Sequence, residues 1–263
     1  MTIEGQIKKM ITENGQPIRY YLTLKDDYLD VNQHIGKKIH LFYDHNECLG
    51  CGLDKPIYRM GYCSNCFFTL PQANESIIRP ELSTAHLGIE QRDLEWEKEF
   101  ELKPHIAYLA LSSNLKVGVT RVSQIPTRWI DQGAGSAIIL AETENRYQAG
   151  MIEVALKAHV ADKTNYRKML LNQTPEINLI EQKELFKQFI PEEQSEFFLP
   201  DNRLFTFDYP VENYPQKIKN LKLTRNQEFE GVLSGIRGQY WIFEDGTVWN
   251  VRGHEGTYIR FDL

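Results

Sequence analysis

Long hydrophobic runs are absent from this sequence. No segment approaches the roughly eighteen consecutive apolar residues that cross a bilayer, so we expect no membrane-spanning helix. The first residues, MTIEGQIKKM, include an acidic side chain and no apolar stretch, which is untypical of a secretory signal. Cysteine is also scarce, with 4 in 263 residues, and we expect these thiols to bind metal rather than to form disulfides. A cytoplasmic protein without membrane contact is therefore the expected class.

Three common catalytic patterns are missing as well. The chain has no glycine-rich P-loop, no G-x-G-x-x-G fingerprint and no G-x-S-x-G elbow. Nucleotide-driven chemistry, dinucleotide-dependent chemistry and serine hydrolysis of that type therefore have no support.

The overall composition is that of a globular protein. Hydrophobic residues make up 41% of the chain, charged residues 25% and aromatic residues 11%, which excludes extended disorder. The net charge of −6 argues against a surface that binds nucleic acid everywhere. The charge is uneven, however, because residues 104–173 are basic while the flanking segments 71–103 and 174–203 are acidic. The basic segment is where we expect a polyanion to bind.

The pattern of short apolar runs and turns predicts an α+β fold with a small β unit at each end. Alternating residues in RYYLTL and KKIHLFY near the start, and in QYWIF and TYIRFDL near the end, are typical of half-buried strands. A cysteine segment, an acidic connector and a mixed α/β core lie between these ends. The predicted units are 1–47 (N-terminal β unit), 48–70 (four-cysteine zinc knuckle), 71–103 (acidic connector), 104–173 (catalytic core), 174–203 (helical linker) and 204–263 (C-terminal β unit).

The two β ends resemble each other at an offset of 220 residues. The ungapped pairs are Tyr20 with Tyr240, Tyr21 with Trp241, Leu22 with Ile242, Val31 with Val251, His34 with His254, Gly36 with Gly256 and Ile39 with Ile259. A duplicated β unit, forming two half-open barrels or two halves of one sheet, explains the match. Chance similarity between hairpins explains it equally well.

The strongest motif is the spacing C-x2-C-x11-C-x2-C, formed by Cys48, Cys51, Cys63 and Cys66. Each pair makes a tight turn that aims two thiolates at one point. Two such turns complete the tetrahedral sulfur site that Zn²⁺ favours. Because four thiolates leave no coordination position for water, we expect a structural zinc rather than a catalytic one.

The central segment predicts a β-hairpin, a short helix, a third strand and a longer helix. Residues 105–111 and 116–120 are the two arms of the hairpin, and the short helix covers 127–132. The third strand covers 137–141. The longer helix covers 145–159, where apolar residues recur at helical spacing.

This order of elements resembles the core of the GIY-YIG nuclease superfamily over residues 104–173. The first motif of that family falls on Ile106-Ala107-Tyr108 and the second on Lys116-Val117-Gly118. The resemblance implies a three-stranded sheet with flanking helices, cleavage of phosphodiester bonds in nucleic acid, with DNA favoured, and a catalytic Mg²⁺ or Mn²⁺. The family's functional residues fall here on Tyr108, Lys116, Arg128, Glu153 and Asn165. The whole chain also resembles a bacterial family of unknown function that carries this core.

The chemistry suits these residue types. Glu153 would hold the cation through oxygen, and Arg128 presents a fork of N–H donors to a phosphate. The family's first-motif glycine is Ile106 here and its second-motif tyrosine is Lys116, so either Tyr108 activates the water or Lys116 takes part of that role. The side chains expected to follow the phosphate backbone are Arg121, Lys163, Arg167 and Lys168.

Each of these residues also has an ordinary structural explanation. Tyr108 suits an apolar core, and Glu153 with Lys157 suits a solvated ion pair on a helix. Arg128 suits a surface ion pair and Asn165 a helix cap. The basic residues after the helix suit a solvated face.

Aromatic residues near the C-terminus, Tyr240, Trp241 and Trp249, are candidates to stack on bases or to form a packed core.

Two alternatives to a nuclease stay open. One is a non-catalytic, zinc-containing protein that binds nucleic acid or acts as an adaptor, and the other is a zinc-stapled interaction scaffold without nucleic acid. The sequence indicates no particular oligomeric state.

Overall fold

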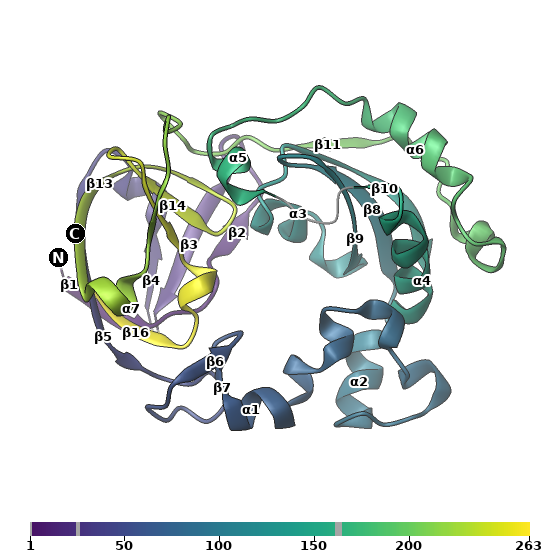
Figure 1. The fold of residues 1–263 in the computed structure, drawn as a ribbon, viewed down its shortest axis with the longest axis horizontal. Helices are drawn as coiled ribbons and strands as arrows, with labels where there is room; N and C mark the ends of the chain where they lie inside the picture. Colours follow the sequence, from purple (N-terminus) through teal and green to yellow (C-terminus); the bar gives the residue numbers. More distant parts are fainter. Residues whose placement is uncertain (1, 25–26, 161–164) are drawn as a thin grey trace.

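The computed structural model describes residues 2–24, 27–160 and 165–263, which form a mixed α+β fold. Figure 1 shows two main bodies side by side: a β-rich body built from both ends of the chain, and an α/β body built from its middle. A small hairpin, α1 and α2 lie along the lower side of both bodies in this view. In the described ranges, no helix has the length and apolar character needed to span a membrane.

The β-rich body combines strands from the two ends of the chain in one sheet. Its seven strands, in spatial order, are β1 (Thr2–Gln6), β16 (Thr257–Asp262), β5 (Lys38–Asn46), β13 (Glu228–Arg237), β14 (Tyr240–Phe243), β15 (Thr247–Asn250) and β12 (Lys219–Leu221). A second sheet runs in the order β2 (Ile11–Glu13), β3 (Arg19–Leu24) and β4 (Asp27–Asp30). The two predicted terminal units therefore share a single seven-stranded sheet and a common apolar core.

The two ends repeat one structural plan. β3, β4, a 3₁₀ turn (Val31–His34) and β5 follow in the same order as β14, β15, a 3₁₀ turn (Arg252–His254) and β16. Gly36 and Gly256 occupy the same place before the last strand, with φ values of 78° and 80°. The last strands β5 and β16 pair with each other. β5 also pairs with β13, the strand that precedes β14, and β16 also pairs with β1 at the start of the chain. This shared order of elements is what duplication predicts, and the repeats interlock through β5 and β16. They are not two halves of one sheet, because β3 and β4 pair with β2 in a separate sheet whereas β14 and β15 belong to the seven-stranded one.

The sequence alignment of the repeats needs one correction. Two residues separate β3 from β4, whereas three residues separate β14 from β15. Across the strands, Leu22 pairs with Leu29, and Trp241 pairs with Trp249. Leu22 therefore corresponds to Trp241 rather than to Ile242. The ungapped offset of 220 is wrong by one residue for β3, because the turn that follows β14 is one residue longer.

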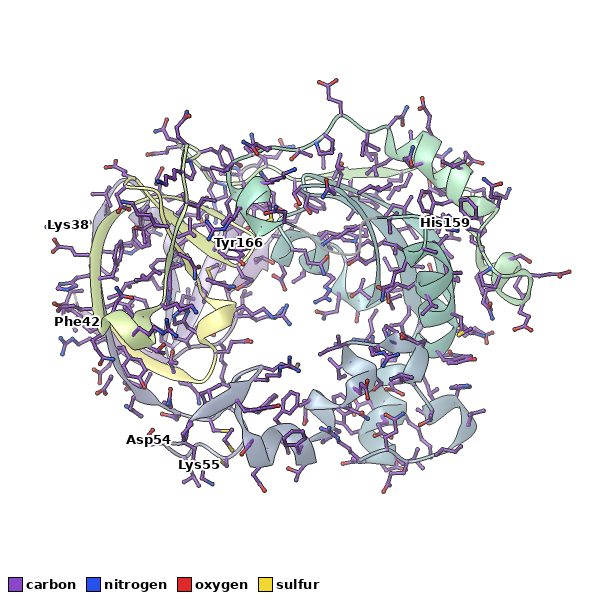
Figure 2. The ribbon with its side chains drawn as sticks, in the orientation of Figure 1. Lys38, Phe42, Asp54, Lys55, His159 and Tyr166 are labelled. Carbon is purple, nitrogen blue, oxygen red and sulfur yellow. The ribbon has the colours of Figure 1, made fainter. Side chains whose placement is uncertain are left out.

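The aromatic residues near the C-terminus mostly form core. Trp241 and Trp249 are each 0% exposed, and their ring centroids lie 5.1 Å apart in an edge-to-face contact beside Phe261. Of the two explanations that the sequence left open for Trp241 and Trp249, the packed core is therefore the correct one, since neither ring is exposed. Tyr240 is partly exposed, but it stacks on Tyr166 with centroids 5.7 Å apart, and Figure 2 shows Tyr166 between the two main bodies.

The α/β body is built on an antiparallel sheet. Its strands, in spatial order, are β11 (Leu204–Thr206), β10 (Ser136–Thr143), β8 (His105–Leu111) and β9 (Leu115–Arg121). The three strands expected from the sequence are present, and β11 adds a fourth from the segment predicted to belong to the C-terminal unit. β8 is central and is buried along its whole length, whereas β9 is an edge strand.

Helices cover both faces of this sheet, which explains why β8 is apolar at almost every position. They are α3 (Thr127–Asp131), α4 (Arg146–Lys157) and α6 (Leu179–Lys187). α4 and α6 pack on the face of Ala107 and Leu109, and α3 packs on the face of Ile106 and Tyr108 through Trp129. The remaining helices are α1 (Ser64–Thr69), α2 (Leu94–Glu101), α5 (Tyr166–Leu170) and α7 (Leu223–Asn226).

The two helices predicted from the sequence are confirmed, and their ends follow from local chemistry. The Asn145 side chain caps α4 by accepting a hydrogen bond of 3.0 Å from the backbone N–H of Gln148. The chain leaves α3 through Gly133, whose φ is 68°. Ile152 and Leu156 bury one face of α4 against the sheet. That packing fixes the orientation of α4 and therefore the position of Glu153, the residue after Ile152.

The cysteine segment and the connector complete the structure. A short hairpin, β6 (Ile57–Arg59) and β7 (Tyr62–Cys63), precedes α1. The connector forms a series of 3₁₀ turns, and one of them (Pro80–Leu82) lies against α4 so closely that a side chain at Gly150 would collide with its backbone. The connector therefore forms one wall beside the helix that carries Glu153.

Acid is expected to destabilise this fold through His105. Its side chain is 0% exposed, its Nδ1 lies 2.7 Å from the Lys103 carbonyl oxygen, and its Nε2 has no described partner. Burial lowers the pKa of His105 to about 4, below its usual 6.5. The unfolded chain therefore binds more protons below pH 6.5, and this residue alone removes about 2 kcal/mol of stability between pH 8 and pH 5.

Urea denaturation of the wild type and of His105→Gln at both pH values measures this loss. We expect the variant to lose less stability on acidification, with the half-exposed His40→Gln as the matched control. Equal pH dependence in wild type and His105→Gln would show that His105 does not carry the effect.

Candidate active site and metal centre

The four cysteines lie together at the base of the small hairpin. The sulfur atoms of Cys48, Cys51, Cys63 and Cys66 are all within 4.8 Å of one another. Backbone N–H groups of Gly50 and Cys63 donate to Cys48 Sγ at 3.4 and 3.2 Å. Gly50 is required by close approach, because a Cβ there would lie 2.9 Å from Cys66 Sγ. These sulfurs are close enough together to hold one zinc ion.

The electrostatics of the cluster suit a dication. Although burial raises the pKa of Cys48, backbone N–H donors from Cys51, Cys63 and Gly50 lower it to about 6. Burial, together with the neighbouring thiols, raises the pKa of Cys66 to about 12. Four adjacent thiols cannot all ionise on their own, and a bound Zn²⁺ is what allows them to do so.

A separate cleft lies at the β9 edge of the sheet in the α/β body. It has a volume of about 490 Å³ and is bounded by β8, β9, α3, α4 and the connector. It brings together four of the five residues that the sequence marked as catalytic, and a fifth residue marked for phosphate contact. These are Tyr108, Lys116, Arg128, Glu153 and Arg121.

The side chain of Tyr108 lies across the edge strand β9 at the position of a glycine. It is 0% exposed and its hydroxyl donates to Gln132 Oε1 at 3.0 Å. Gly118 is its cross-strand partner, and a Cβ at Gly118 would come within 2.6 Å of the Tyr108 hydroxyl oxygen. Burial raises the pKa of Tyr108, although Arg128 opposes this rise. The absence of a side chain at Gly118 therefore gives the Tyr108 hydroxyl room to reach the cleft.

Lys116 lies two residues before Gly118 on β9, so both residues point to the same face of the sheet. Burial in the cleft lowers the pKa of Lys116 to about 7, and the nearby Arg128 acts in the same direction. A substantial fraction of this amine is therefore neutral at physiological pH and able to accept a proton.

Glu153 lies on the opposite side of the cleft from α3. It is 8% exposed, and its Oε2 lies 3.4 Å from Lys157 Nζ. Burial raises the pKa of Glu153, and Lys157 partly counteracts this rise. A carboxylate that is buried at a cleft wall and has one partly exposed cation beside it is a suitable oxygen ligand for a hard divalent cation.

Arg146 is a cleft residue that the sequence reasoning missed. Its side chain is buried, and Nε and Nη2 donate to the carbonyl oxygens of Ser76 and Ile77 at 2.9 and 2.8 Å. Burial lowers the pKa of Arg146 to about 10. It precedes Glu153 by seven residues, which places both on one face of α4. That spacing is the signal that could have identified it.

The remaining predicted residues lie elsewhere or outside the described chain. Asn165 is not part of the cleft lining and caps α5, its Oδ1 accepting from the backbone N–H groups of Arg167 and Lys168. Arg167 and Lys168 are on that short helix and are absent from the described lining of the cleft. Lys163 lies outside the described residues. Arg121, in contrast, lines the cleft with its guanidinium carbon 4.3 Å from the Phe100 ring centroid.

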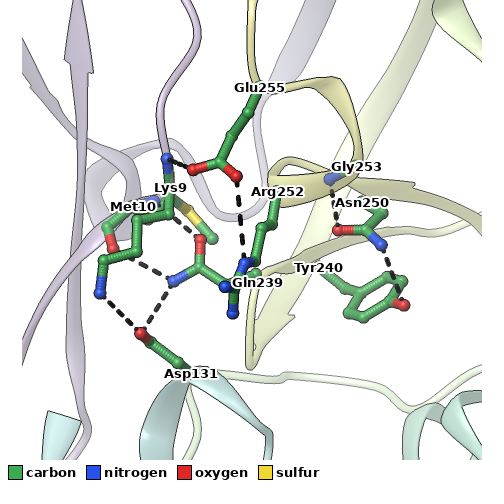
Figure 3. Close-up of polar contacts among 9 residues, drawn as sticks. All are labelled: Lys9, Met10, Asp131, Gln239, Tyr240, Asn250, Arg252, Gly253 and Glu255. Carbon is green, nitrogen blue, oxygen red and sulfur yellow. Dashed lines mark hydrogen bonds and ion pairs between the residues drawn. The ribbon is translucent and has the colours of Figure 1, made fainter. Parts of the chain in front are cut away.

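The helix that carries Arg128 is anchored to the β-rich body. Asp131 at the end of α3 accepts from Lys9 Nζ at 2.8 Å and from Gln239 Nε2 at 2.9 Å. Gln239 is held in turn by the backbone of Met10, and Figure 3 shows this network between the two bodies. The β-rich body therefore fixes one wall of the cleft.

The fold and site define an α+β protein with four cysteines close enough to hold a metal ion and with a cation-rich cleft. Among the described residues that line this cleft, Glu153 is the one carboxylate. Comparison with protein families identifies it further. A model described as "Protein of unknown function (DUF2797)" matches residues 36–259, and the chain belongs to this family. The match includes the cysteine cluster and the whole cleft. No curated protein and no solved structure gives a significant match.

Proposed function

We propose that this protein is a metal-dependent endonuclease that hydrolyses phosphodiester bonds in nucleic acid, with DNA as the favoured substrate. The single observation that carries the proposal is the composition of the cleft. Tyr108, Arg128 and Glu153 come from three separate elements and line one cavity at the edge of an antiparallel sheet. The order hairpin, arginine helix, strand, glutamate helix further supports a GIY-YIG-like core.

The cations of the cleft suit the substrate. Lys116, Arg121, Arg128 and Arg146 all line it, and Glu153 is the carboxylate among its described lining residues. An arginine fork presents parallel N–H donors to phosphate oxygens and stabilises the negative charge that grows during hydrolysis. The positive charge of Arg128 also acts to lower the pKa of both Tyr108 and Lys116, which places its guanidinium near both side chains. We assign it to the scissile phosphate.

The residues fit a catalytic Mg²⁺ or Mn²⁺ held by Glu153. The fit rests on the donor set: one buried carboxylate whose Oε2 accepts no hydrogen bond and contacts Lys157 at 3.4 Å. Such an ion is usually bound by one or two carboxylates and several waters. When bound, it supplies Lewis-acid stabilisation to the phosphate and the leaving oxygen.

Lys116 is the better candidate for the group that accepts the proton of the attacking water. Burial raises the pKa of Tyr108, so its hydroxyl stays protonated and can donate to Gln132 or to a substrate oxygen. The pKa of Lys116 is lowered to about 7 by burial, which suits a general base near neutral pH. Lys116 would thus replace the tyrosine of the second family motif.

A non-catalytic protein that binds nucleic acid or acts as an adaptor is the alternative, and two observations favour it. Glu153 is already paired with Lys157. Ile106 takes the place of the first-motif glycine and is 0% exposed, so this position is core. In both proposals the zinc centre is a structural module, because its four ligands are all sulfur.

Salt-dependent DNA binding tests the use of the cleft. We expect the affinity of the zinc-loaded protein for a labelled duplex to fall steeply with salt, and we expect Arg128→Met to reduce the magnitude of the slope of log affinity against log salt by about 1. Arg203→Met, an exposed position outside the cleft lining, is the matched control. A salt-insensitive affinity would contradict both nucleic-acid proposals, whereas steep binding without any cleavage would favour the alternative.

A further inference from the structure

A second cavity lies where the two main bodies meet, apart from the cleft. Its volume is about 450 Å³, and none of its described lining residues also lines the cleft. Residues of β10, of the segment after α5 and of β13 contribute to its lining. Its polar lining residues include Ser136, Asn172, Thr174, Asp208, Tyr214 and Arg237.

Arg237 is a buried cation with only neutral partners. It is 2% exposed, its Nε donates to the Gly133 carbonyl oxygen at 3.2 Å, and its Nη1 donates to Asn172 Oδ1 at 2.7 Å. Its guanidinium carbon lies 5.2 and 5.8 Å from the ring centroids of Tyr209 and Tyr214. Across the described ranges, it forms no ion pair with a carboxylate.

One side of this guanidinium is available to the cavity. The described hydrogen bonds of Arg237 use its Nε and Nη1 atoms and leave Nη2 without a described acceptor. A methyl group added to Gly135, which lines the cavity, would lie 4.0 Å from this Nη2. A buried charge without a counter-charge is costly, and an oxyanion supplies both the charge and the acceptor atoms. Asp208, which is exposed, lines the same cavity, and its negative charge disfavours a ligand that carries several phosphates.

We propose that this cavity binds a single phosphoryl group through Arg237. The group belongs either to a small phosphorylated molecule or to the end of a nucleic acid strand, since both present the same oxygens. The site is independent of the cleft and of cleavage there, so binding at it stands or falls separately from the nuclease proposal.

Calorimetric titration with inorganic phosphate, at ionic strength held constant with chloride, tests the site. We expect the wild type to bind phosphate, and Arg237→Met to weaken binding by about tenfold or more, since a charge-assisted hydrogen bond is lost. Arg203→Met removes one positive charge from an exposed position outside this cavity and is expected to bind like wild type. Absence of phosphate binding by the wild type would overturn the proposal.

Gly135→Ala is the second variant, because Arg237→Met also removes hydrogen bonds that hold the chain around Gly133. The nearest atoms to the new methyl group are the Leu111 carbonyl oxygen at 3.8 Å and Arg237 Nη2 at 4.0 Å, so the substitution fits without a clash. The methyl group occupies the space that the phosphoryl oxygens need. We expect weaker phosphate binding with unchanged melting temperature, and unchanged binding by Gly135→Ala would overturn the proposal even if Arg237→Met does not fold.

Oligonucleotides distinguish the two sources of the phosphoryl group. The probes are one sequence with a 5′-phosphate and the same sequence with a 5′-hydroxyl, compared without added Mg²⁺ or Mn²⁺ so that no cleavage occurs. Tighter binding of the phosphorylated strand by wild type, lost in Gly135→Ala, assigns the site to strand ends. Equal binding of both strands, with inorganic phosphate still bound at Arg237, assigns it to a small phosphorylated molecule.

Discussion

Glu153→Gln is expected to lower the rate of DNA cleavage about a thousandfold while the protein stays folded. The reason is the loss of the only carboxylate among the described residues that line the cleft. A divalent cation contributes several kcal/mol of charge stabilisation to the transition state, and each 1.36 kcal/mol is about a factor of ten in rate. Glutamine keeps the size of the side chain but is a neutral, weaker ligand.

The fold should tolerate this substitution. Burial already raises the pKa of Glu153, so the charged form is disfavoured in the folded protein. Lys157, its ion-pair partner, is partly exposed and can be solvated when the carboxylate is removed. Loss of cleavage together with an unchanged melting temperature is therefore the expected combination.

Single-turnover cleavage of a labelled duplex in Mn²⁺ measures the effect. Glu144→Gln is the matched control, since Glu144 is exposed, precedes α4 and is absent from the cleft lining. Comparable loss in both variants, or a Glu153→Gln rate within about tenfold of the wild type, would place the catalytic cation elsewhere.

Removing metal from the cysteine cluster is expected to lower the melting temperature by about 10 °C. A structural zinc contributes much of the folding free energy of a small metal-bound module, and a few kcal/mol corresponds to such a shift in a chain of this size. The module also supports the β-rich body, since Gly61, in the turn between β6 and β7, packs against Glu255 and the backbone of Gly256. Losing the metal should therefore loosen contacts beyond the cluster itself.

Cys63→Ser and treatment with a strong chelator should give the same result. We expect the wild type to contain one zinc per chain and the variant substantially less. Ser64→Ala, the exposed neighbour at the start of α1, is the matched control. An unchanged melting temperature after complete removal of zinc would contradict the structural role.

Local features of the fold could be predicted because short stretches of sequence encode them. The spacing of Cys48, Cys51, Cys63 and Cys66 predicted the cluster, since two tight turns are enough to bring the sulfurs together. The run His105–Leu111 predicted a buried strand because its side chains are almost all apolar. Asn145 marked the start of α4 through its capping side chain.

Long-range pairing could not be predicted, because it depends on contacts between distant segments. Nothing local in Leu204–Thr206 indicates that it pairs with β10, more than sixty residues earlier in the chain. The interlocking of β1 with β16 and of β5 with β13 likewise joins the two ends of the chain. The sequence repeat was visible, but its one-residue correction required the strand register.

The same distinction applies to the candidate site. Tyr108, Arg128 and Glu153 were predicted together from a resemblance to a nuclease core, and in the structure all three line one cleft. Arg146 and Arg237 were missed because their importance lies in burial without a carboxylate partner, which only packing creates. Asn165 follows α4 at a suggestive spacing, but local hydrogen bonding makes it the cap of α5.

The most direct test is nicking of supercoiled plasmid and branched DNA by the zinc-loaded wild type. Mg²⁺ and Mn²⁺ are compared with no added cation, a condition that leaves the cysteine-bound zinc in place. We expect nicked product only with the added cation, at a rate that rises with pH through about 7, where Lys116 loses its proton. Tight DNA binding with no product under any of these conditions would contradict the nuclease proposal and leave the cleft as a recognition site.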